Sequence, residues 1–197
     1  MGQYYFPVNL DKKEYLCSHD FKTRYVRKED KKVYYISEGL KLMEHSYIGN
    51  IMMNAVEKLI IPNGNWYKNR LVWAGDYADH EVGHKKTNNG KDVNLFHIMM
   101  DMEGTKIKPS TKKVDKKYRY LTNHSKKVII DLTIIRPTED GMNLHPLSLL
   151  IAEGNGRGGG DFRGEDKRVG SWSRDIISLE EKMIDGYQLV DGQFIEE

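Results

Sequence analysis

Apolar residues follow helical spacing in one long segment of this chain. Between Ser46 and Ile61 they recur at intervals of three and four residues, which is typical of an amphipathic helix. The members of this set are Ile48, Ile51, Met52, Ala55, Val56, Leu59 and Ile60. Pro62-Asn63-Gly64 supplies the stop that ends a helix. A second, shorter helix is predicted over 144–153, where Pro146 is tolerated because it falls in the first turn.

Short segments rich in Tyr, Val, Ile and Trp lie elsewhere between turn residues, and this pattern is typical of strands. The predicted hairpins are 4–8 with 14–17, 118–122 with 127–135, and 187–190 with 193–195 across Asp191-Gly192. Two further strands are predicted over 66–74 and 170–177. The remaining segments are a charged, exposed excursion at 22–32, a loop at 77–92 and an apolar stretch of undecided type at 95–102.

The first two hairpins repeat the same residues. Tyr4 matches Tyr118, Asn9 matches Asn123, and the pair Lys12-Lys13 matches Lys126-Lys127, all at one spacing along the chain. A constant spacing indicates duplication of a structural unit. We therefore expect an α+β fold of two similar halves, each built of antiparallel hairpins and a helix and related by a pseudo-two-fold axis. The expected boundaries are 1–103 for the first half, 104–117 for a basic connector and 118–197 for the second half, in one compact unit.

Composition narrows the class of protein. The chain has 197 residues, of which 39% are hydrophobic and 30% charged, as expected for a globular protein with a core of its own. No apolar run approaches the roughly 20 residues that cross a membrane, and the first residues resemble no signal peptide. Cys17 is the single cysteine, which excludes an internal disulfide. These features predict a protein of a bacterial-type cytosol that makes no membrane contact.

Basic charge is concentrated in the connector. Nine Lys and Arg residues lie between Lys106 and Lys127, against the single acid Asp115. Such a segment is either a solvated linker or a surface that attracts an anionic partner. Tyr118 and Tyr120 interleave with the charges, which suits single-stranded nucleic acid, although one buried strand face explains the same alternation.

His80-Glu81-Val82-Gly83-His84 has the spacing of a zinc hydrolase or peptidase. In such enzymes a helix brings both imidazoles to one zinc ion, and the glutamate acts as general base. The surrounding residues do not favour a helix, because a strand and a turn precede the segment and 85–90 offer no apolar face. Zinc at His80 and His84 is therefore the alternative prediction, beside a surface loop with two ordinary histidines and a non-catalytic metal site.

Residues 154–164 form a glycine-rich loop. Its Gly154, Gly156 and Gly159 match the spacing of a dinucleotide fingerprint, but a predicted helix precedes the loop where that fingerprint requires a strand. Glycines let backbone N–H groups approach a ligand closely, and Arg157 and Arg163 are suited to phosphate or carboxylate. The alternative is a tight structural crossover beneath Trp172.

Several phrases of the sequence resemble one family. They include Val8-Asn-Leu-Asp-Lys-Lys-Glu-Tyr-Leu16, Gly75-Asp-Tyr-Ala-Asp79, Asn155-Gly-Arg-Gly-Gly-Gly-Asp-Phe162 and Val169-Gly-Ser-Trp172. The chain resembles an uncharacterised family of small proteins from bacteriophages and bacterial mobile elements, over most of its length except 22–36 and 103–117. That resemblance implies an accessory viral role such as counter-defence. It implies no catalytic residue, and in that family the Gly-Asp-Tyr-Ala-Asp phrase need not precede a histidine pair.

The function expected from the sequence is therefore non-enzymatic binding of a host protein, a nucleic acid or a phosphorylated ligand, by a monomer or homodimer without a cofactor. The expected ligand-binding residues are Asn155, Arg157, Asp161, Arg163, Trp172 and Arg174. The alternative remains a zinc-dependent hydrolase with His80 and His84 as ligands and Glu81 as base. Since the histidine loop belongs only to the first half and the glycine-arginine loop only to the second, we expect these loops to meet at one cleft.

Overall fold

The computed structural model describes residues 3–83, 93–138, 141, 143–155 and 158–195. Its helices are α1 (Leu42–His45), α2 (Ile51–Ile60), α3 (Leu95–Ile98) and α4 (Pro146–Leu150), with 3-10 turns at Ser18–Asp20 and Leu132–Ile134 and a π-helical turn at Met99–Glu103. The strands of the first half are β1 (Tyr5–Asn9), β2 (Glu14–Tyr15), β3 (Lys22–Val26), β4 (Val33–Ser37), β5 (Asn69–Gly75) and β6 (Thr105–Lys106). Those of the second half are β7 (Tyr120–Asn123), β8 (Val128–Asp131), β9 (Ala152–Glu153), β10 (Ile176–Glu180) and β11 (Gln188–Leu189).

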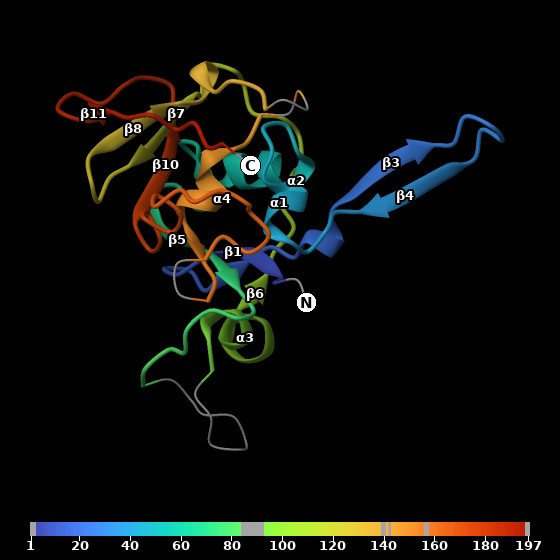
Figure 1. Cartoon of the computed structure of the whole chain (residues 1–197), viewed down its shortest axis with the longest axis horizontal. Coiled ribbons are helices and arrows are strands. Elements are labelled where there is room, and N and C mark those ends of the chain that lie inside the picture. The colour runs from blue at the N-terminus through green and yellow to red at the C-terminus, as the bar shows by residue number, and fades with distance from the viewer. Residues whose placement is uncertain (1–2, 84–92, 139–140, 142, 156–157, 196–197) are drawn as a thin grey trace.

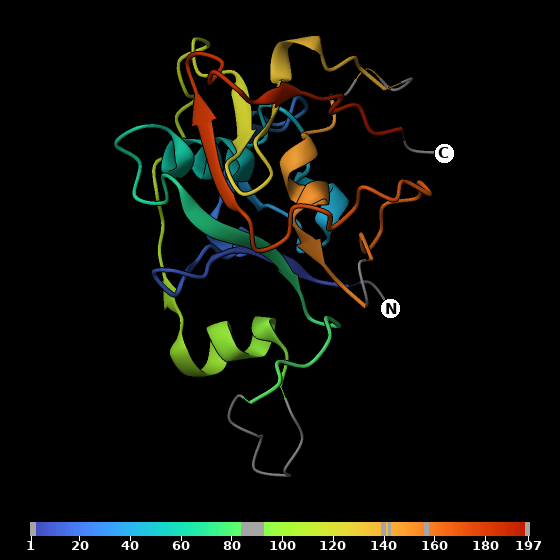
Figure 2. The ribbon, with the colours of Figure 1, turned by 90° about the vertical axis from the view of Figure 1, so that its left-hand side faces the viewer.

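One mixed sheet organises the molecule, in the order β11-β8-β7-β10-β5-β1-β2-β6. Strand β5 lies at its centre: it pairs antiparallel with β1 on one side, and on the other side with β10 at its start and β9 at its end. Both halves of the chain therefore share this sheet. Together with the helices on its faces (Figures 1 and 2), it confirms the α+β class.

Both faces of β5 are covered, which explains its nearly continuous apolar sequence. Leu71 and Trp73 belong to the main core, with side chains from α1, α2 and α4. Val72 and Ala74 point to the opposite face, where α3 packs. Alternate residues of a strand point to opposite faces, so the single strand β5 contributes side chains to two hydrophobic clusters. Figure 2 shows α3 apart from the other helices.

The two hairpins predicted from the repeat have matching turns. Asn9 Oδ1 accepts the backbone N–H of Lys12 at 3.0 Å, and Asn123 Oδ1 accepts that of Lys126 at 3.0 Å. The next residue in each turn, Lys13 or Lys127, has a positive φ, of 52° and 54° respectively.

The strands that follow Trp66 and Trp172 also correspond. The backbone N–H of Lys68 donates to the carbonyl of Ile177 at 3.1 Å, and that of Arg174 donates to the carbonyl of Leu71 at 2.8 Å. These bonds flank the pairing of β5 with β10. The similarity covers these strands and turns. Because the segments around them differ, duplication of the whole half about a pseudo-two-fold axis stays a prediction.

The long helix begins later than its apolar pattern indicates. Gly49 has a φ of 89°, which lies outside the helical region, and Asn50 then caps α2 by accepting the N–H groups of Met52 and Met53. Residues 46–50 instead carry a turn and the bridge between Tyr47 and Leu144. The helix predicted over 144–153 is likewise confined to α4, because Ala152 and Glu153 pair with β5.

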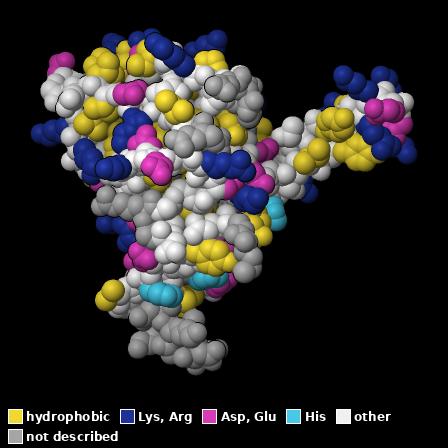
Figure 3. Space-filling model, in the orientation of Figure 1, with side chains coloured by type: hydrophobic (Ala, Val, Ile, Leu, Met, Phe, Trp, Pro, Cys, Tyr) yellow, Lys and Arg dark blue, Asp and Glu magenta, His cyan; other side chains and the backbone are white. Residues whose placement is uncertain are grey.

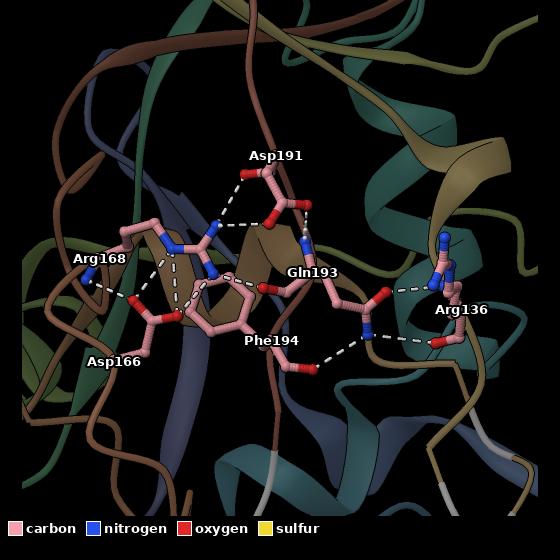
Figure 4. Close-up of polar contacts among 6 residues, drawn as sticks. All are labelled: Arg136, Asp166, Arg168, Asp191, Gln193 and Phe194. Atoms are coloured by element: carbon pink, nitrogen blue, oxygen red, sulfur yellow. Dashed lines mark hydrogen bonds and ion pairs between the residues drawn. The ribbon is translucent and has the colours of Figure 1, made fainter.

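The predicted final hairpin is wrong. Strand β11 pairs in parallel with β8, and 191–195 form no strand. Figure 4 shows the cause. The guanidinium of Arg168 donates to the backbone carbonyls of Asp191 and Gln193 and lies 4.6 Å from the ring centre of Phe194. Asp166 fixes that guanidinium from the other side. The Arg168 side chain thus occupies backbone carbonyls that would accept hydrogen bonds in a hairpin. The local sequence pattern around 187–195 does not reveal this contact.

The strand predicted over 170–177 is displaced. Residues 170–174 form turns in which Gly170 has a φ of 71° and Arg174 a φ of 65°, and β10 begins only at Ile176. The turns let Trp172 point into the core, where it is 5% exposed.

Candidate functional site

Strands β3 and β4 form an arm that extends away from the rest of the molecule (Figure 1). We refer to residues 22–37 as the arm. Its five residue pairs run from Lys22 opposite Ser37 to Val26 opposite Val33, and every residue of both strands is exposed. An isolated two-stranded ribbon is marginally stable in water. Within the described part of the chain, no other element buries these two strands.

Each face of the arm combines an aromatic with a basic side chain. On one face Arg24 lies opposite Tyr35, and on the other Tyr25 lies opposite Tyr34. The guanidinium of Arg27 lies 5.3 Å from the ring centre of Tyr34. Tyr35 is 66% exposed and Ile36, on the other face, is 57% exposed. Such side chains offer flat apolar surface beside positive charge.

Positive charge predominates along the arm and is concentrated at its tip (Figure 3). The arm carries six basic residues and two acidic ones, Glu29 and Asp30. Asp30 is engaged by Arg27 and Lys32, and the hydrogen bond from Arg27 lowers the pKa of this carboxyl. Four cations of the arm have no ion pair with any acid in the described part of the chain: Lys22, Arg24, Lys28 and Lys31.

The base of the arm is anchored in the core. Phe21 is 1% exposed, and its carbonyl accepts the N–H of Glu38 at 2.9 Å, which closes the ribbon. The carboxylate of Glu38 in turn accepts the side-chain amide of Asn50 at 2.7 Å. Since Asn50 caps α2, the arm is fixed to the start of the longest helix.

The basic connector runs past this base. Lys106 forms an ion pair with Asp20 at 3.1 Å, directly before the arm, and the side chain of Lys113 lies beside Gly49. Lys117 and Arg119 pair with Glu181 and Asp131. Among the described residues, the other connector lysines have no acidic partner: Lys108, Lys112, Lys113 and Lys116. The arm and the connector thus place unpaired cations around the start of α2.

The histidine loop lies beside the start of the glycine-rich loop, of which only Gly154 lines the shared cleft. An open cavity of about 510 Å³ is lined by Asp79 to Val82 from the first half and by Glu153, Gly154 and Arg174 from the second. Arg174 joins the two sides by donating to the carboxylates of Glu153, at 2.6 and 2.8 Å, and of Glu81. These hydrogen bonds raise the pKa of the guanidinium.

The histidine segment does not form the predicted zinc helix over its described part. His80 pairs with Asn94 in an isolated bridge, and a turn follows at Val82 and Gly83. The Glu81 carboxylate is bound by Arg174, so it faces a cation where a general base would face water. His84 lies outside the described residues. Among the described residues, no group of three or more His, Cys, Asp or Glu side chains could hold a metal ion. The zinc alternative stays a prediction.

The glycine loop packs around Tyr5. A Cβ added to Gly154 would lie 2.2 Å from the Tyr5 hydroxyl, and one added to Gly160 would lie 2.5 Å from its ring. That hydroxyl lies 2.9 Å from the carbonyl of Gly158. Burial raises the pKa of Tyr5, and the charges of Asp76 and Asp161 raise it further. These glycines therefore serve close packing, but around Tyr5, whereas the sequence suggested a crossover beneath Trp172.

The predicted ligand residues are dispersed by the fold. Asp161 accepts the N–H of Met43 at 2.9 Å and so caps α1 from a distance. Trp172 is core, and Arg174 belongs to the cleft. Asn155 and Arg163 are exposed, while Arg157 lies outside the described residues.

The aromatic and basic residues of the arm were not among the site residues predicted from the sequence. Their signal was present as two β-prone runs, Lys22–Val26 and Val33–Ser37, on either side of polar turn residues.

Comparison of the chain with protein-family models, with curated proteins and with solved structures found no match in any of the three. No helix in the described part of the chain is long and apolar enough to cross a membrane.

Proposed function

We propose that the protein binds nucleic acid, with the arm and the basic connector as its contact surface. The observation that carries the proposal is the arm, a projecting β-ribbon whose two faces combine exposed tyrosines with cations that have no acidic partner among the described residues. The proposal narrows the expected partners, a host protein, a nucleic acid or a phosphorylated ligand, to one class. It is compatible with an accessory role in counter-defence.

Charge and aromatic surface support this choice together. Unpaired lysines and arginines gain free energy by displacing the counterions of a phosphate backbone. Tyrosine rings provide faces on which unpaired bases stack. A two-stranded ribbon is also narrow enough to enter the major groove of a duplex. A protein partner would explain the apolar exposure of Ile36, but it gives no reason for cations along the whole arm and the adjoining connector.

Binding of fluorescent single-stranded and duplex oligonucleotides, measured by anisotropy between 50 and 200 mM salt, tests the proposal (roughly the range over which phosphate contacts weaken most visibly). We expect affinity to fall linearly with salt on a double-logarithmic plot. The double variant Lys28→Glu/Lys31→Glu should bind at least about tenfold more weakly, with a salt slope smaller by about two.

The matched control is Lys167→Glu/Lys182→Glu, which changes two exposed lysines outside the arm and the connector. It makes the same change in net charge and should retain most of the affinity. Equal loss in both variants, or binding that is insensitive to salt, would contradict an interface at the arm. Both variants alter exposed positions, so folding is preserved and can be checked by circular dichroism.

A further inference from the structure

A hollow of about 270 Å³ lies between α2 and the basic connector. Ile48, Leu132 and the ring of Tyr118 contribute apolar surface to its wall. Glu57 and Asn54 line it from the helix, and both are largely buried, with Asn54 only 4% exposed. The pocket therefore combines apolar walls with a buried acceptor, the usual composition of a small-molecule site.

Glu57 is held in place by a buried histidine. Nδ1 of His145 accepts the N–H of Leu147 at 3.2 Å, so the ring proton is on Nε2. That Nε2–H faces Oε1 of Glu57 at 3.3 Å, and His145 itself is fully buried. Among the described residues nothing donates to the second carboxylate oxygen, Oε2. A fixed carboxylate with one oxygen available is suited to accept hydrogen bonds from a ligand.

The mouth of the pocket has the opposite charge. Lys113 and Lys116 line it, are exposed, and form no ion pair within the described part of the chain. Asp115 lies between them, and its carboxylate accepts the backbone N–H of Lys117 at 3.0 Å. Arg119, also at the pocket, is paired with Asp131. Lys113 and Lys116 can therefore bind an anionic group at the mouth. Inside the pocket, the Glu57 carboxylate can accept hydrogen bonds from a ligand.

We propose that this pocket binds a guanine nucleotide, with the base inside and the phosphate at Lys113 and Lys116. Guanine carries two adjacent N–H donors on its Watson–Crick edge, which complement the two oxygens of Glu57: Oε2 has no donor among the described residues, and Oε1 keeps a second lone pair beside the one that His145 uses. Adenine and cytosine place an acceptor nitrogen beside their amino group, and uracil has a single ring N–H between two carbonyls. The source is either a free nucleotide or a guanine residue in a nucleic acid. The proposal shares its ligand class and the connector lysines with the proposed function, but Glu57 and Asn54 lie outside the arm and the connector.

Calorimetric titration of the whole protein with guanosine monophosphate and with adenosine monophosphate tests the pocket. Guanosine monophosphate should bind more tightly. Glu57→Gln should weaken it roughly 10- to 100-fold, because the amide replaces an acceptor with donors. The amide oxygen still accepts from His145, so this variant should fold. Lys113→Glu/Lys116→Glu, at exposed positions, should also weaken binding. Equal affinity for the two nucleotides, or unchanged affinity in Glu57→Gln, would overturn the proposal.

Two comparisons separate this site from the arm and identify its source. The arm variant Lys28→Glu/Lys31→Glu should bind guanosine monophosphate as well as the unaltered protein does, and a parallel loss there would overturn an independent pocket. A thymidine oligonucleotide with one central guanine supports a nucleic-acid source if it binds better than the all-thymidine oligonucleotide and loses that preference in Glu57→Gln. Without such a preference, retained binding of guanosine monophosphate supports the free nucleotide. The proposed function is tested separately by measuring whether the arm variant loses oligonucleotide binding.

Discussion

The indole Nε1–H of Trp73 donates a hydrogen bond of 3.0 Å to Nε2 of His45, and both side chains are fully buried. The acceptor role of Nε2 places the ring proton on Nδ1, which lies 3.4 Å from the carbonyl of Gly39. Protonation of Nε2 would bring two donors face to face. Burial accordingly lowers the pKa of His45 to about 4, although the backbone hydrogen bond with Gly39 opposes the shift.

The protein should lose stability in mild acid. Between pH 6.5 and about 4 the unfolded chain binds a proton at His45 that the folded protein does not. This contribution to stability is therefore complete above pH 6.5 and is lost as the pH falls toward 4. The expected loss between pH 7.5 and 5.0 is about 2 kcal/mol of unfolding free energy, measurable by urea denaturation.

A variant isolates the histidine responsible. Burial also lowers the pKa of His124, so the total pH dependence has more than one source. His45→Gln should reduce the pH-dependent part by about 2 kcal/mol. An identical pH dependence in the His45 variant would show that this imidazole is not the titrating group.

Elements whose contacts are local could be predicted from the sequence. The hairpins β1–β2 and β7–β8 follow from strand-forming residues around an asparagine that bonds its own turn, and the repeat of Asn9 at Asn123 marked both. A cleft between the histidine loop and the glycine-rich loop was expected, but Gly154 is the only residue of 154–164 that lines it, and the contact with Glu81 comes from Arg174. Helix α2 was identified, but its start depends on the backbone conformation of Gly49.

Elements that depend on distant side chains could not be predicted. The terminal segment is held by Arg168 across 23 and 25 residues of sequence, which removes the carbonyls of a hairpin. The glycines near Gly160 suggested ligand binding because Tyr5, the side chain that they accommodate, is far away in sequence. The arm was recognised only as charged and exposed, because nothing local shows that its two β-prone runs pair with each other without a covering layer.

Gly160 should tolerate no side chain. It has a φ of 63°, and an added Cβ would lie 2.5 Å from the Tyr5 ring. Gly160→Ala therefore combines backbone strain with a clash and should cost about 2–4 kcal/mol of unfolding free energy. The control is Gly186→Ala, where φ is 79° and nothing lies within 4 Å of the added Cβ. It should cost only about 1 kcal/mol. Equal costs in thermal or urea unfolding would show that Tyr5 does not shape the loop.

The contribution of the Arg174 ion pairs to stability can be measured by comparing Arg174 with Lys68, which has a similar backbone conformation. Arg174 and Lys68 both have positive φ and are both exposed, but Lys68 contacts Tyr67 and Arg174 binds Glu81 and Glu153. Arg174→Met should destabilise the protein by about 1–3 kcal/mol more than Lys68→Met, because it leaves two half-buried carboxylates without their cation. Urea unfolding at low and high salt provides the comparison. A difference near zero would mean that the pairs are solvated and contribute nothing to stability.

The aromatic residues of the arm should affect binding without affecting the fold. Tyr35 is 66% exposed on its strand, so Tyr35→Ala should change the unfolding free energy by no more than about 0.5 kcal/mol. Loss of one stacked base should weaken single-stranded oligonucleotide binding by about 1–3 kcal/mol, seen in anisotropy titrations. Tyr77→Ala, at a residue 48% exposed outside the arm, is the control and should bind normally. If the Tyr35 variant binds normally while the charge variant binds weakly, the arm contacts phosphates only. That result would contradict base stacking on Tyr35.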